Sequence, residues 1–537
     1  MRDTCERVDA AVVQAVEGIT YSGALASEEV LARFRLPIRR RGCGIRSRRW
    51  LASGAFCGCF RTACESFLDS RTADGSRRRG FFPQLQELFG NGPLAFDFLT
   101  RFLESSSSIA AAFSEAWTEM QEEVDGVVDL GTGPLSFSAA LVPIRLHMQR
   151  AIAQQREAAM ARRVDVMMLA LPREDPRRAS WLEAADGAHI AGRWLASHPS
   201  ETLGLVCSSA EFSEALVSYL GIDSPAASTP GVLGVAFSGY SGGRRRFIVD
   251  AGGWELERVQ MPGDGWRDAH DHVAGVMFGI AFDAGLRGTT EPRGIFSQAV
   301  PMEVLAAALE AEAADSGGRR TRPGAIPDAQ ITVDGRRQLY DVKLIHFCRS
   351  RYWPTARVAN ARGGMLEHRA QAVQREYTAG AAALDVRTEQ HYTRLGQPVP
   401  EGRPTAVQIL ASFPPVSGLV FGSTAGGGSR EVGTLIGQSA SSAAQRHWRM
   451  LGTRSMSEAR AWMLSVMRQQ VGFAAAIAHA RLRLSRLERI GHSGRIAGRS
   501  GAVTAPFLSQ TMWERHGRGP LGGGGGRAGA MGSGLFG

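Results

Sequence analysis

Apolar residues recur at three- and four-residue spacing through most of residues 8–220, in segments such as VDAAVVQAVEGI and SAEFSEALVSYLGI. This spacing puts the apolar side chains on one face of a helix, so we expect a mainly helical N-terminal region over residues 1–225. The passage GIDSPAASTPGVLG, rich in Gly, Ser and Pro, then indicates a domain boundary. Helical spacing returns later in the chain and predicts a helical C-terminal cap over residues 416–493. Residues 494–537 end in a glycine-rich stretch that cannot build a core, and we expect them to be disordered.

Residues 226–415 mix strand and helix signals, and two of their segments are typical of a β-hairpin. AIPDAQITV and RRQLYDVKLI contain β-branched residues in partial alternation, and Asp334 and Gly335 between them form a common two-residue hairpin turn. With such a turn, Asp328 on the first strand lies directly opposite Asp341 on the second. The pattern therefore predicts two carboxylates side by side on one face of a sheet.

Lys343 is the only lysine of the chain, whereas the other 61 of the 62 basic residues are arginine. It stands two residues after Asp341 and so points to the same face of the strand, while Val342 points to the other. Opposed aspartates have Cβ atoms about 5 Å apart and repel each other, so they need a cation or solvent between them. A divalent metal takes carboxylate oxygens, and a lysine beside it can orient a metal-bound water or stabilise the charge on a phosphate. The alternative, an exposed hairpin with ordinary charged side chains, stays open at this point.

The Pro-Asp pair, the hairpin and the Asp-x-Lys pattern together resemble the restriction-endonuclease-like PD-(D/E)xK nucleases. The resemblance implies a mixed α/β fold with an α-β-β-β-α-β core flanked by largely α-helical regions. In this sequence we expect a helix over about 268–285, a first strand in TTEPRGIFSQ and then the hairpin. A helix in MLEHRAQAVQREYTAGAAALD and a last strand in TAVQILASF would complete the core.

The same resemblance implies roles for individual residues. Asp328 and Asp341 would hold Mg²⁺ or Mn²⁺, with the backbone carbonyl of Val342 as a further ligand. Lys343 would act in catalysis together with the two aspartates. In the family an extra acidic ligand usually comes from the first helix or strand of the core. The candidates for it are Glu291 and, on a helix in VPMEVLAAALEAEA, Glu303.

His270 and Arg369 are candidate contacts to nucleic acid. His270 in WRDAHDHV matches the start of the family's first helix and can contact a phosphate. The neighbouring Asp268 and Asp271 can instead simply favour the N-terminus of that helix. Arg369 in HRAQAVQREY lies on a predicted helix whose polar face can point either at a DNA backbone or at solvent.

A second resemblance covers more of the chain. The patches PGDGWRDAHDHV, YDVKLIHFCRSRY, VSGLVFGS and RFRLPIRRRGCGIRS are similar to the segment that follows the polymerase in the reverse-transcriptase reading frames of retroelements. This resemblance implies an endonuclease that acts on DNA, with the nucleus as one compartment. The sequence departs from the family because the polymerase with its paired aspartates is absent and no Cys-His knuckle is visible in FSGYSGGRRRFIVDAGGWELERV. Beside a metal-dependent DNA endonuclease, these departures leave open a catalytically inactive nucleic-acid-binding or structural remnant of a retroelement polyprotein.

The charge of the chain also suggests nucleic acid as a partner, either DNA or RNA. The formal net charge is +10, and arginine supplies nearly all of the positive groups. Arginine binds phosphate through a planar, often bidentate fork. Eight arginines, among them Arg39, Arg40 and Arg41, fall within residues 33–49, which we interpret as a basic loop that faces either phosphate or solvent.

The spacing of the cysteines and the hydropathy of the chain indicate the cellular compartment of the protein. The seven cysteines are irregularly spaced, which favours a reducing intracellular compartment over a disulfide framework. The N-terminus lacks the apolar stretch of a signal peptide, and the longest apolar run, HVAGVMFGIAFDAGL, is interrupted and too short to span a bilayer. We therefore expect a soluble protein with no membrane partner.

The glycine-rich stretch STAGGGS at residues 423–429 has no lysine after it, so it is not a phosphate-binding Walker loop. We expect a flexible turn there.

Overall fold

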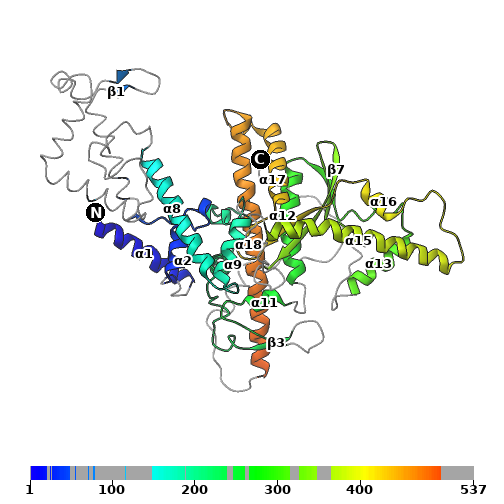
Figure 1. The fold of residues 1–537 in the computed structure, drawn as a ribbon, viewed down its shortest axis with the longest axis horizontal. Coiled ribbons are helices and arrows are strands. Elements are labelled where there is room, and N and C mark those ends of the chain that lie inside the picture. Colours follow the sequence, from blue (N-terminus) through cyan, green and yellow to red (C-terminus); the bar gives the residue numbers. More distant parts are fainter. Residues whose placement is uncertain are drawn as a thin grey trace. The chain divides into compact units, whose positions relative to one another are not determined.

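The computed structural model describes residues 2–20, 25, 27–48, 148–187, 189–238, 246–259, 265–314, 326–346 and 364–497, with a few short pieces between residues 49 and 147 (Figure 1). These residues form a mixed α/β protein that is mostly helical. The chain divides into two compact units near residue 170. The Gly/Ser/Pro-rich passage at 221–234 lies inside the second unit, which also holds the helices just before it.

The first unit is mainly helical where the structure describes it, as the apolar spacing predicts, and it also contains two strands of two residues each. Helix α2 packs against α8, and the short helix η2 between them contacts α8 as well. The elements are α1 Arg2–Thr20, α2 Glu28–Arg35, η2 Ile38–Arg40, β1 Ser70–Arg71, β2 Arg77–Arg78 and α8 Met148–Ala170.

The second unit combines a four-stranded sheet with helices on both of its faces. Its helices are α9 Pro176–Asp186, η3 Arg193–Ala196, α10 Ser209–Leu220, α11 Trp254–Arg258, α12 Gly265–Asp283, α13 Met302–Ala314, α15 Met365–Arg394, α16 Ala406–Ala411, α17 Arg430–His447 and α18 Met456–Ala497. Its strands are β3 Ala236–Ser238, β4 Arg246–Ile248, β5 Arg287–Thr290, β6 Ala329–Val333, β7 Arg336–Ile345 and β8 Ser417–Gly422.

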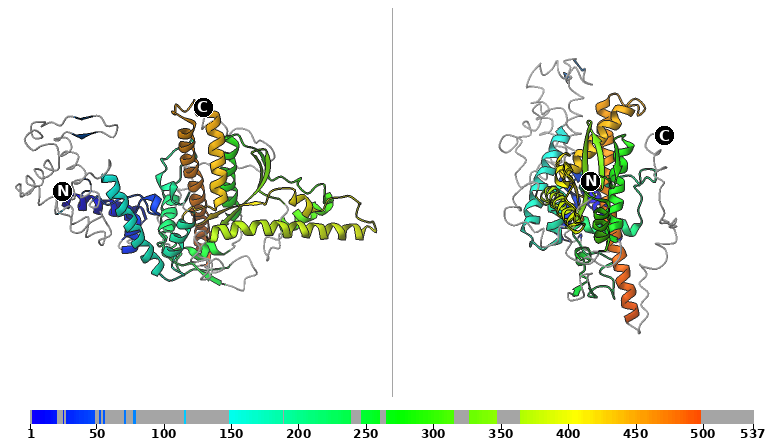
Figure 2. Two further views of the ribbon diagram at one scale, coloured as in Figure 1. Left: turned by 45° about the horizontal axis from the view of Figure 1, so that its top comes forward. Right: turned by 90° about the vertical axis from the view of Figure 1, so that its right-hand side faces the viewer.

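The main sheet has the order β5-β6-β7-β8, in which the first three strands are antiparallel and β8 runs parallel to β7. Alternation along β7 separates its two faces. Tyr340 and Val342 join a core built with α12, α17 and α18, while Leu339 joins a second core with α13, α15 and α16. Figure 2 shows α15 as a long helix whose C-terminal part extends away from the sheet.

A close approach between α15 and β8 depends on a glycine. A Cβ atom added to Gly418 would lie 2.8 Å from the Cα atom and the carbonyl oxygen of Ala370, so a larger residue would push the helix off the sheet. Gln374 fixes the same contact, because its Oε1 accepts a hydrogen bond of 2.6 Å from the backbone N–H of Val416, just before β8.

The predicted hairpin is confirmed. Val333 pairs with Arg336, as the two-residue turn requires. Asp334 and Gly335 in the turn have φ angles of 48° and 76°. Positive φ at both central residues is the type I′ geometry, which matches the twist of the flanking strands and which Asp-Gly adopts readily.

The first strand of the core begins and ends earlier than expected. The prediction in TTEPRGIFSQ is wrong beyond Thr290, because β5 covers Arg287–Thr290. Glu291 has a φ of 43°, which is outside the strand region, and Pro292 after it has no N–H for a ladder. Both features end the strand.

The prediction of the last core strand in TAVQILASF is also wrong, because this segment is not a strand. It forms α16, whose N-terminus carries a capping box between Thr405 and Gln408. Ala406 and Leu410, four residues apart, face the core beside α15, as a helix requires. The strand that pairs with β7 is β8, in the segment VSGLVFGS that follows.

The glycine-rich stretch 423–429 is buried rather than a flexible turn. Glu183 on α9 holds it, since its carboxylate accepts hydrogen bonds from the backbone N–H groups of Thr424 at 2.9 Å and Ala425 at 2.7 Å. Burial raises the pKa of Glu183 to about 7, although these donors favour its ionised form. The glycines of this stretch are needed for packing, because a Cβ on Gly426 would lie 2.7 Å from the carbonyl oxygen of Gly472.

The C-terminal helices α17 and α18 confirm the helical spacing, and α18 continues to Ala497. We expect disorder over residues 494–537, but residues 494–497 belong to α18. The rest of the tail, residues 498–537, lies outside the described part of the chain. In the described part, no helix combines the length and the apolar character needed to cross a membrane.

Candidate active site

Asp341 on β7 is the centre of the predicted site, and its side chain is only 5% exposed. The Lys343 ammonium Nζ lies 2.6 Å from Asp341 Oδ2. On the other side, the hydroxyl of Tyr377 on α15 donates a hydrogen bond of 2.9 Å to Asp341 Oδ1. The carboxylate is therefore fixed from two directions, by its own strand and by the helix that covers that face.

Asp328 immediately precedes β6, where continuation of the β6–β7 register puts it opposite Asp341. Its Oδ2 accepts a hydrogen bond of 2.6 Å from the backbone N–H of Val342 and lies 3.2 Å from Nε2 of His270. The described hydrogen bonds of this carboxylate all go to Oδ2. The N-terminal end of β6, the middle of β7 and α12 thus meet at one acidic centre.

The two carboxyl groups differ in their electrostatics. Burial raises the pKa of Asp341, and the charge of Asp328 adds to this effect although Lys343 opposes it. Burial would also raise the pKa of Asp328, but the hydrogen bond and the charge of His270 outweigh it, so this pKa lies below its usual range.

His270 is a cation at neutral pH. Burial alone would lower its pKa, but the hydrogen bonds to Asp271 and Asp328 raise the pKa to about 9. With both ring nitrogens protonated, His270 donates to Asp271 at 2.9 Å and to Asp328 at 3.2 Å. It therefore belongs to the centre and does more than begin a helix.

The two candidates for an extra acidic ligand lie differently. The backbone N–H of Glu291 donates to the carbonyl of Asp328 at 2.9 Å, but its exposed carboxylate pairs with Arg293 at 2.9 Å. Glu303 is exposed on α13. Within the described residues, no described contact joins the carboxylate of Glu291 or Glu303 to the pair of aspartates.

The predicted nucleic-acid contacts on α15 and in the basic loop have partners within the protein. Arg369 forms an ion pair with Glu376 on the same helix. The segment predicted as a basic loop is partly helical, since Arg39 and Arg40 lie in η2. Carboxylates of α8 bind it: Arg39 pairs with Glu157, and Arg41 pairs with Asp165 at 2.8 Å. Arg40 is exposed.

The donors at the centre are of the kind that a hard divalent cation prefers. Mg²⁺ and Mn²⁺ bind carboxylate oxygens and keep several waters, so two aspartates leave positions for water and phosphate. Among the described residues, no group of three His, Cys, Asp or Glu side chains could hold a metal ion. A cation at this place would rest on Asp328 and Asp341, and it would relieve the repulsion between them.

Tyr377 was not a candidate from the sequence. It lies in HRAQAVQREY, where the three- and four-residue spacing marks it as a core residue, and it is indeed buried. Its hydroxyl reaches Asp341 only because α15 crosses β7, and no local pattern in the sequence carries that information.

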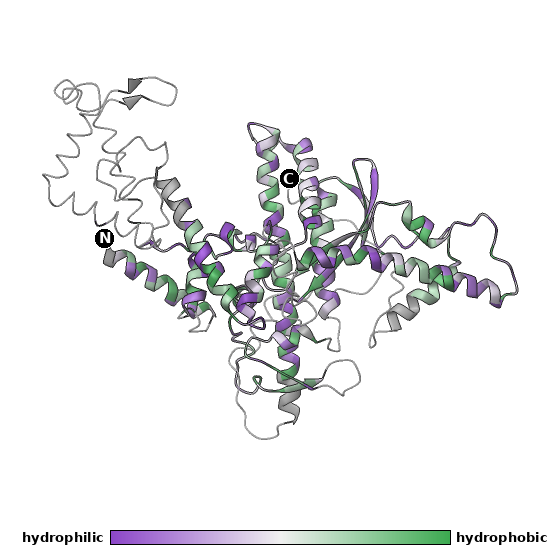
Figure 3. Ribbon diagram, viewed as in Figure 1, coloured by the Kyte–Doolittle hydropathy of each residue, from purple (hydrophilic) through white to green (hydrophobic). Residues whose placement is uncertain are grey.

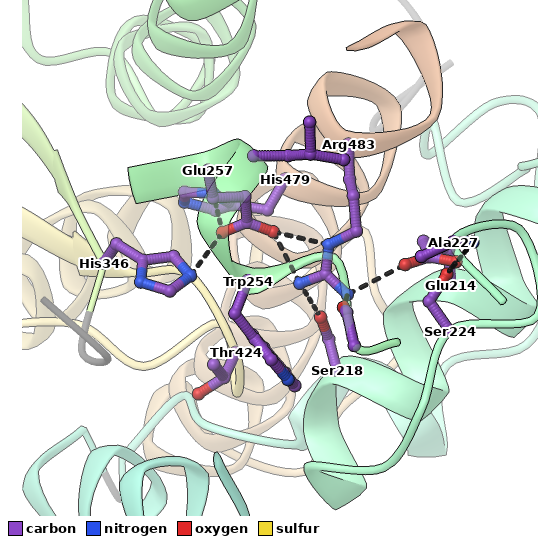
Figure 4. Close-up of polar contacts among 12 residues, drawn as sticks. Glu214, Ser218, Ser224, Ala227, Trp254, Glu257, His346, Thr424, His479 and Arg483 are labelled. Atoms are coloured by element: carbon purple, nitrogen blue, oxygen red, sulfur yellow. Dashed lines mark hydrogen bonds and ion pairs between the residues drawn. The ribbon is translucent and has the colours of Figure 1, made fainter. Parts of the chain in front are cut away.

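A second polar cluster, also missed, is buried between α10, α11 and α18 and the end of β7 (Figure 4). Arg483 donates to Glu257 at 2.5 Å and 2.8 Å and to Glu214 at 2.8 Å. Trp254 lies against the guanidinium, with its ring centre 4.6 Å away. His346, directly after β7, contacts the other oxygen of Glu257 at 3.1 Å.

The buried cluster keeps Glu257 ionised. Burial would raise the pKa of Glu257, but Arg483 and the two histidines His346 and His479 hold it well below its usual range. Arg483 and Glu257 are completely buried. The cluster is therefore an ion network that excludes water, and it joins α10, α11, α18 and the end of β7.

His479 in this network predicts an acid-dependent loss of stability. Burial lowers its pKa to about 4, from 6.5 in an exposed histidine. As the pH falls below 6.5, the unfolded chain binds a proton that the folded chain does not, so the His479 contribution is complete above pH 6.5 and declines toward pH 4. The loss by pH 5 is about 2 kcal/mol of unfolding free energy.

Urea unfolding at pH 7.5 and pH 5 checks this prediction with His479→Gln. The variant has no titrating group at this position, so its stability is expected to change less between the two pH values than that of the parent. Equal pH dependence in both proteins would contradict the assignment.

Comparison with known proteins gives no further identification. No protein-family model matches the chain, and no curated protein matches it.

Proposed function

We propose that this chain is a divalent-metal-dependent endonuclease that hydrolyses DNA phosphodiester bonds, with a restriction-endonuclease-like PD-(D/E)xK domain. The observation that carries the proposal is the meeting of Asp328, Asp341 and Lys343 at one place on the sheet, with Lys343 Nζ 2.6 Å from Asp341. Two carboxylates could hold a divalent metal that activates water, and the lysine beside them could stabilise the charge that develops on a phosphate.

The order of the elements supports the same proposal. A helix, α12, precedes the three antiparallel strands β5, β6 and β7, and α15 then leads to β8, which is parallel to β7. This is the α-β-β-β-α-β order implied by the sequence resemblance, with α13 and α16 as additional helices.

Each residue of the centre has a chemical role in this proposal. Asp328 and Asp341 would hold Mg²⁺ or Mn²⁺, which when bound supplies an activated water and charge for the phosphate oxygens. Tyr377 keeps the Asp341 carboxylate in place through its hydrogen bond. Lys343 brings a compact positive charge to the phosphate, and His270 fixes Asp328.

Nicking of supercoiled plasmid in Mg²⁺ or Mn²⁺ tests the proposal. The parent is expected to nick the plasmid and to stop when the metal is chelated. Asp341→Asn removes the charge of one metal ligand and is expected to lower the rate about 10³-fold, which corresponds to about 4 kcal/mol of transition-state stabilisation.

Asp334→Asn is the matched control, because it changes an aspartate of the same hairpin. Asn-Gly is also favourable in a type I′ turn, so the fold and the nicking rate are expected to stay as in the parent. Equal nicking by the parent and by Asp341→Asn would show that the activity lies elsewhere.

A non-catalytic nucleic-acid-binding protein is the second candidate. It is favoured by the exposed ion pair of Glu291 with Arg293, which leaves two carboxylates at the centre. DNA binding by the parent without nicking in either metal would support this candidate instead.

A further inference from the structure

One part of the sheet face beside the acidic centre carries arginine and polar side chains. Arg287 on β5 pairs with Thr332 on β6, which in turn pairs with Arg337 on β7. Directly paired residues in antiparallel strands point to the same face, so these three side chains form one row across the sheet. We call this row the arginine strip. Its two arginines lie on either side of Thr332, with backbones about 10 Å apart.

The arginine strip faces the same way as the acidic centre. Thr332 and Asp328 are four residues apart along the chain, and so are Arg337 and Asp341. An even number of residues along a strand keeps side chains on one face, and four residues span about 13 Å. The strip and the two aspartates therefore lie about 13 Å apart on the same face of the sheet.

Among the residues that the structure describes, this part of the face is exposed and not packed under a helix. Helix α15 covers the sheet at Leu339, which is buried in one core with Tyr377 of that helix. In contrast, Arg287, Arg337 and every residue of β5 are exposed. Figure 3 shows the turn end of the hairpin as hydrophilic.

The two arginines of the strip bring positive charge to this end of the sheet. Within the described parts of the chain, no ion pair is described for Arg287 or Arg337. A third arginine, Arg446 on α17, donates to the carbonyl of Gly285 at 2.8 Å, two residues before β5. The acidic residues nearby, Asp283 and Asp334, stand at the end of α12 and in the hairpin turn, outside the row.

We propose that the arginine strip binds the phosphate backbone of duplex DNA within a few nucleotides of the phosphate at the acidic centre. The position of that phosphate rests on the proposed function, whereas binding at the strip does not. A row of two arginines fits a polyanion because each guanidinium can bind phosphate oxygens through its fork. The 13 Å to the aspartates corresponds to about four nucleotides of rise along the duplex axis.

Salt-dependent binding tests the strip without any cutting. A fluorescein-labelled 30-base-pair duplex is titrated with protein in EDTA at several salt concentrations, and the anisotropy gives the affinity. Each arginine–phosphate contact contributes about 0.9 to the slope of log affinity against log salt. The double variant Arg287→Gln/Arg337→Gln is expected to lower the magnitude of the slope by about 2 and to weaken binding more than about tenfold at 0.1 M salt.

Arg394→Gln is the matched control. Arg394 is exposed at the end of α15, 17 residues after Tyr377, and so lies about 25 Å farther along that helix. The slope of this variant is expected to equal that of the parent. Thermal unfolding of all three proteins checks that the exposed substitutions leave the fold intact.

The outcomes separate this proposal from the proposed function. A double variant with the affinity and slope of the parent, or a parent that does not bind the duplex, would overturn the arginine strip, even if the parent nicks plasmid. If the double variant has a reduced slope and the parent does not nick in Mg²⁺ or Mn²⁺, the result would support binding at the strip and contradict the proposed nuclease function.

Discussion

Arg483→Met is expected to lower the free energy of unfolding by about 3–5 kcal/mol. Arg483 is completely buried and donates to both Glu257 and Glu214, which are buried with it. Methionine fills much of the volume of the arginine stem but donates no hydrogen bond. Two carboxylates would then stay in the interior without their cation, and removing one partner of a buried ion pair has a cost of this size.

Urea unfolding at pH 7.5 measures the effect, with Arg481→Met as the control. Arg481 lies two residues away on α18 and pairs with Glu211 at 2.7 Å, but its side chain is 46% exposed. Exposed ion pairs contribute about 0–1 kcal/mol, so the control is expected to be nearly as stable as the parent. Adding Glu257→Gln to Arg483→Met is expected to restore part of the loss. Equal stability of the two single variants would mean that the network is not closed to water.

Lys343→Ala is expected to lower the nicking rate by about 10²–10⁴-fold, if the chain is the nuclease proposed above. The ammonium group lies 2.6 Å from Asp341 and is the only lysine charge in the chain. Lys343→Arg is expected to restore little activity, because the guanidinium is wider and cannot give up a proton at ordinary pH. Comparison of both variants with the parent in the plasmid assay gives the two rates.

Binding of the labelled duplex in EDTA shows whether Lys343→Ala loses catalysis or DNA binding. Lys343→Ala is expected to bind with nearly the affinity of the parent, since one of several positive groups is removed. If Lys343→Ala binds and nicks like the parent, Lys343 has no role in catalysis. Full activity in Lys343→Arg would mean that charge alone suffices at this position.

Part of the fold and most of the acidic centre follow from local sequence. The turn at Asp334 and Gly335 fixes the register of two strands, and the register alone puts Asp328 opposite Asp341. Lys343 then shares the face of Asp341 because side chains alternate along a strand. These relations depend only on neighbouring residues, which is why the sequence predicts them.

The errors arise where a cap or a distant contact decides the structure. TAVQILASF has the composition of a strand, but the capping box from Thr405 to Gln408 begins a helix there. The Glu183 carboxylate, about 240 residues away in the chain, orders the stretch STAGGGS.

The buried network is the part that the sequence conceals most completely. In a chain whose basic residues are nearly all arginine, Arg483 does not differ from its exposed neighbours on α18. Its partners Glu257 and Glu214 come from two other helices, and His346 comes from the end of a strand. Only the tertiary structure brings them together.

The parallel pairing of β7 with β8 bears on the time at which the acidic centre is completed during folding. The strands β5, β6 and β7 can pair through antiparallel neighbours, whereas β8 must return across the connection of residues 346–416. Such non-local contacts close slowly, because the entropy of a long loop is lost before the contacts form. Asp341 is paired in register with Gly418 of β8, so its surroundings are finished only in this late step. During synthesis the hairpin leaves the ribosome before β8. The nascent chain therefore contains both aspartates and the lysine well before β8 can fix their positions.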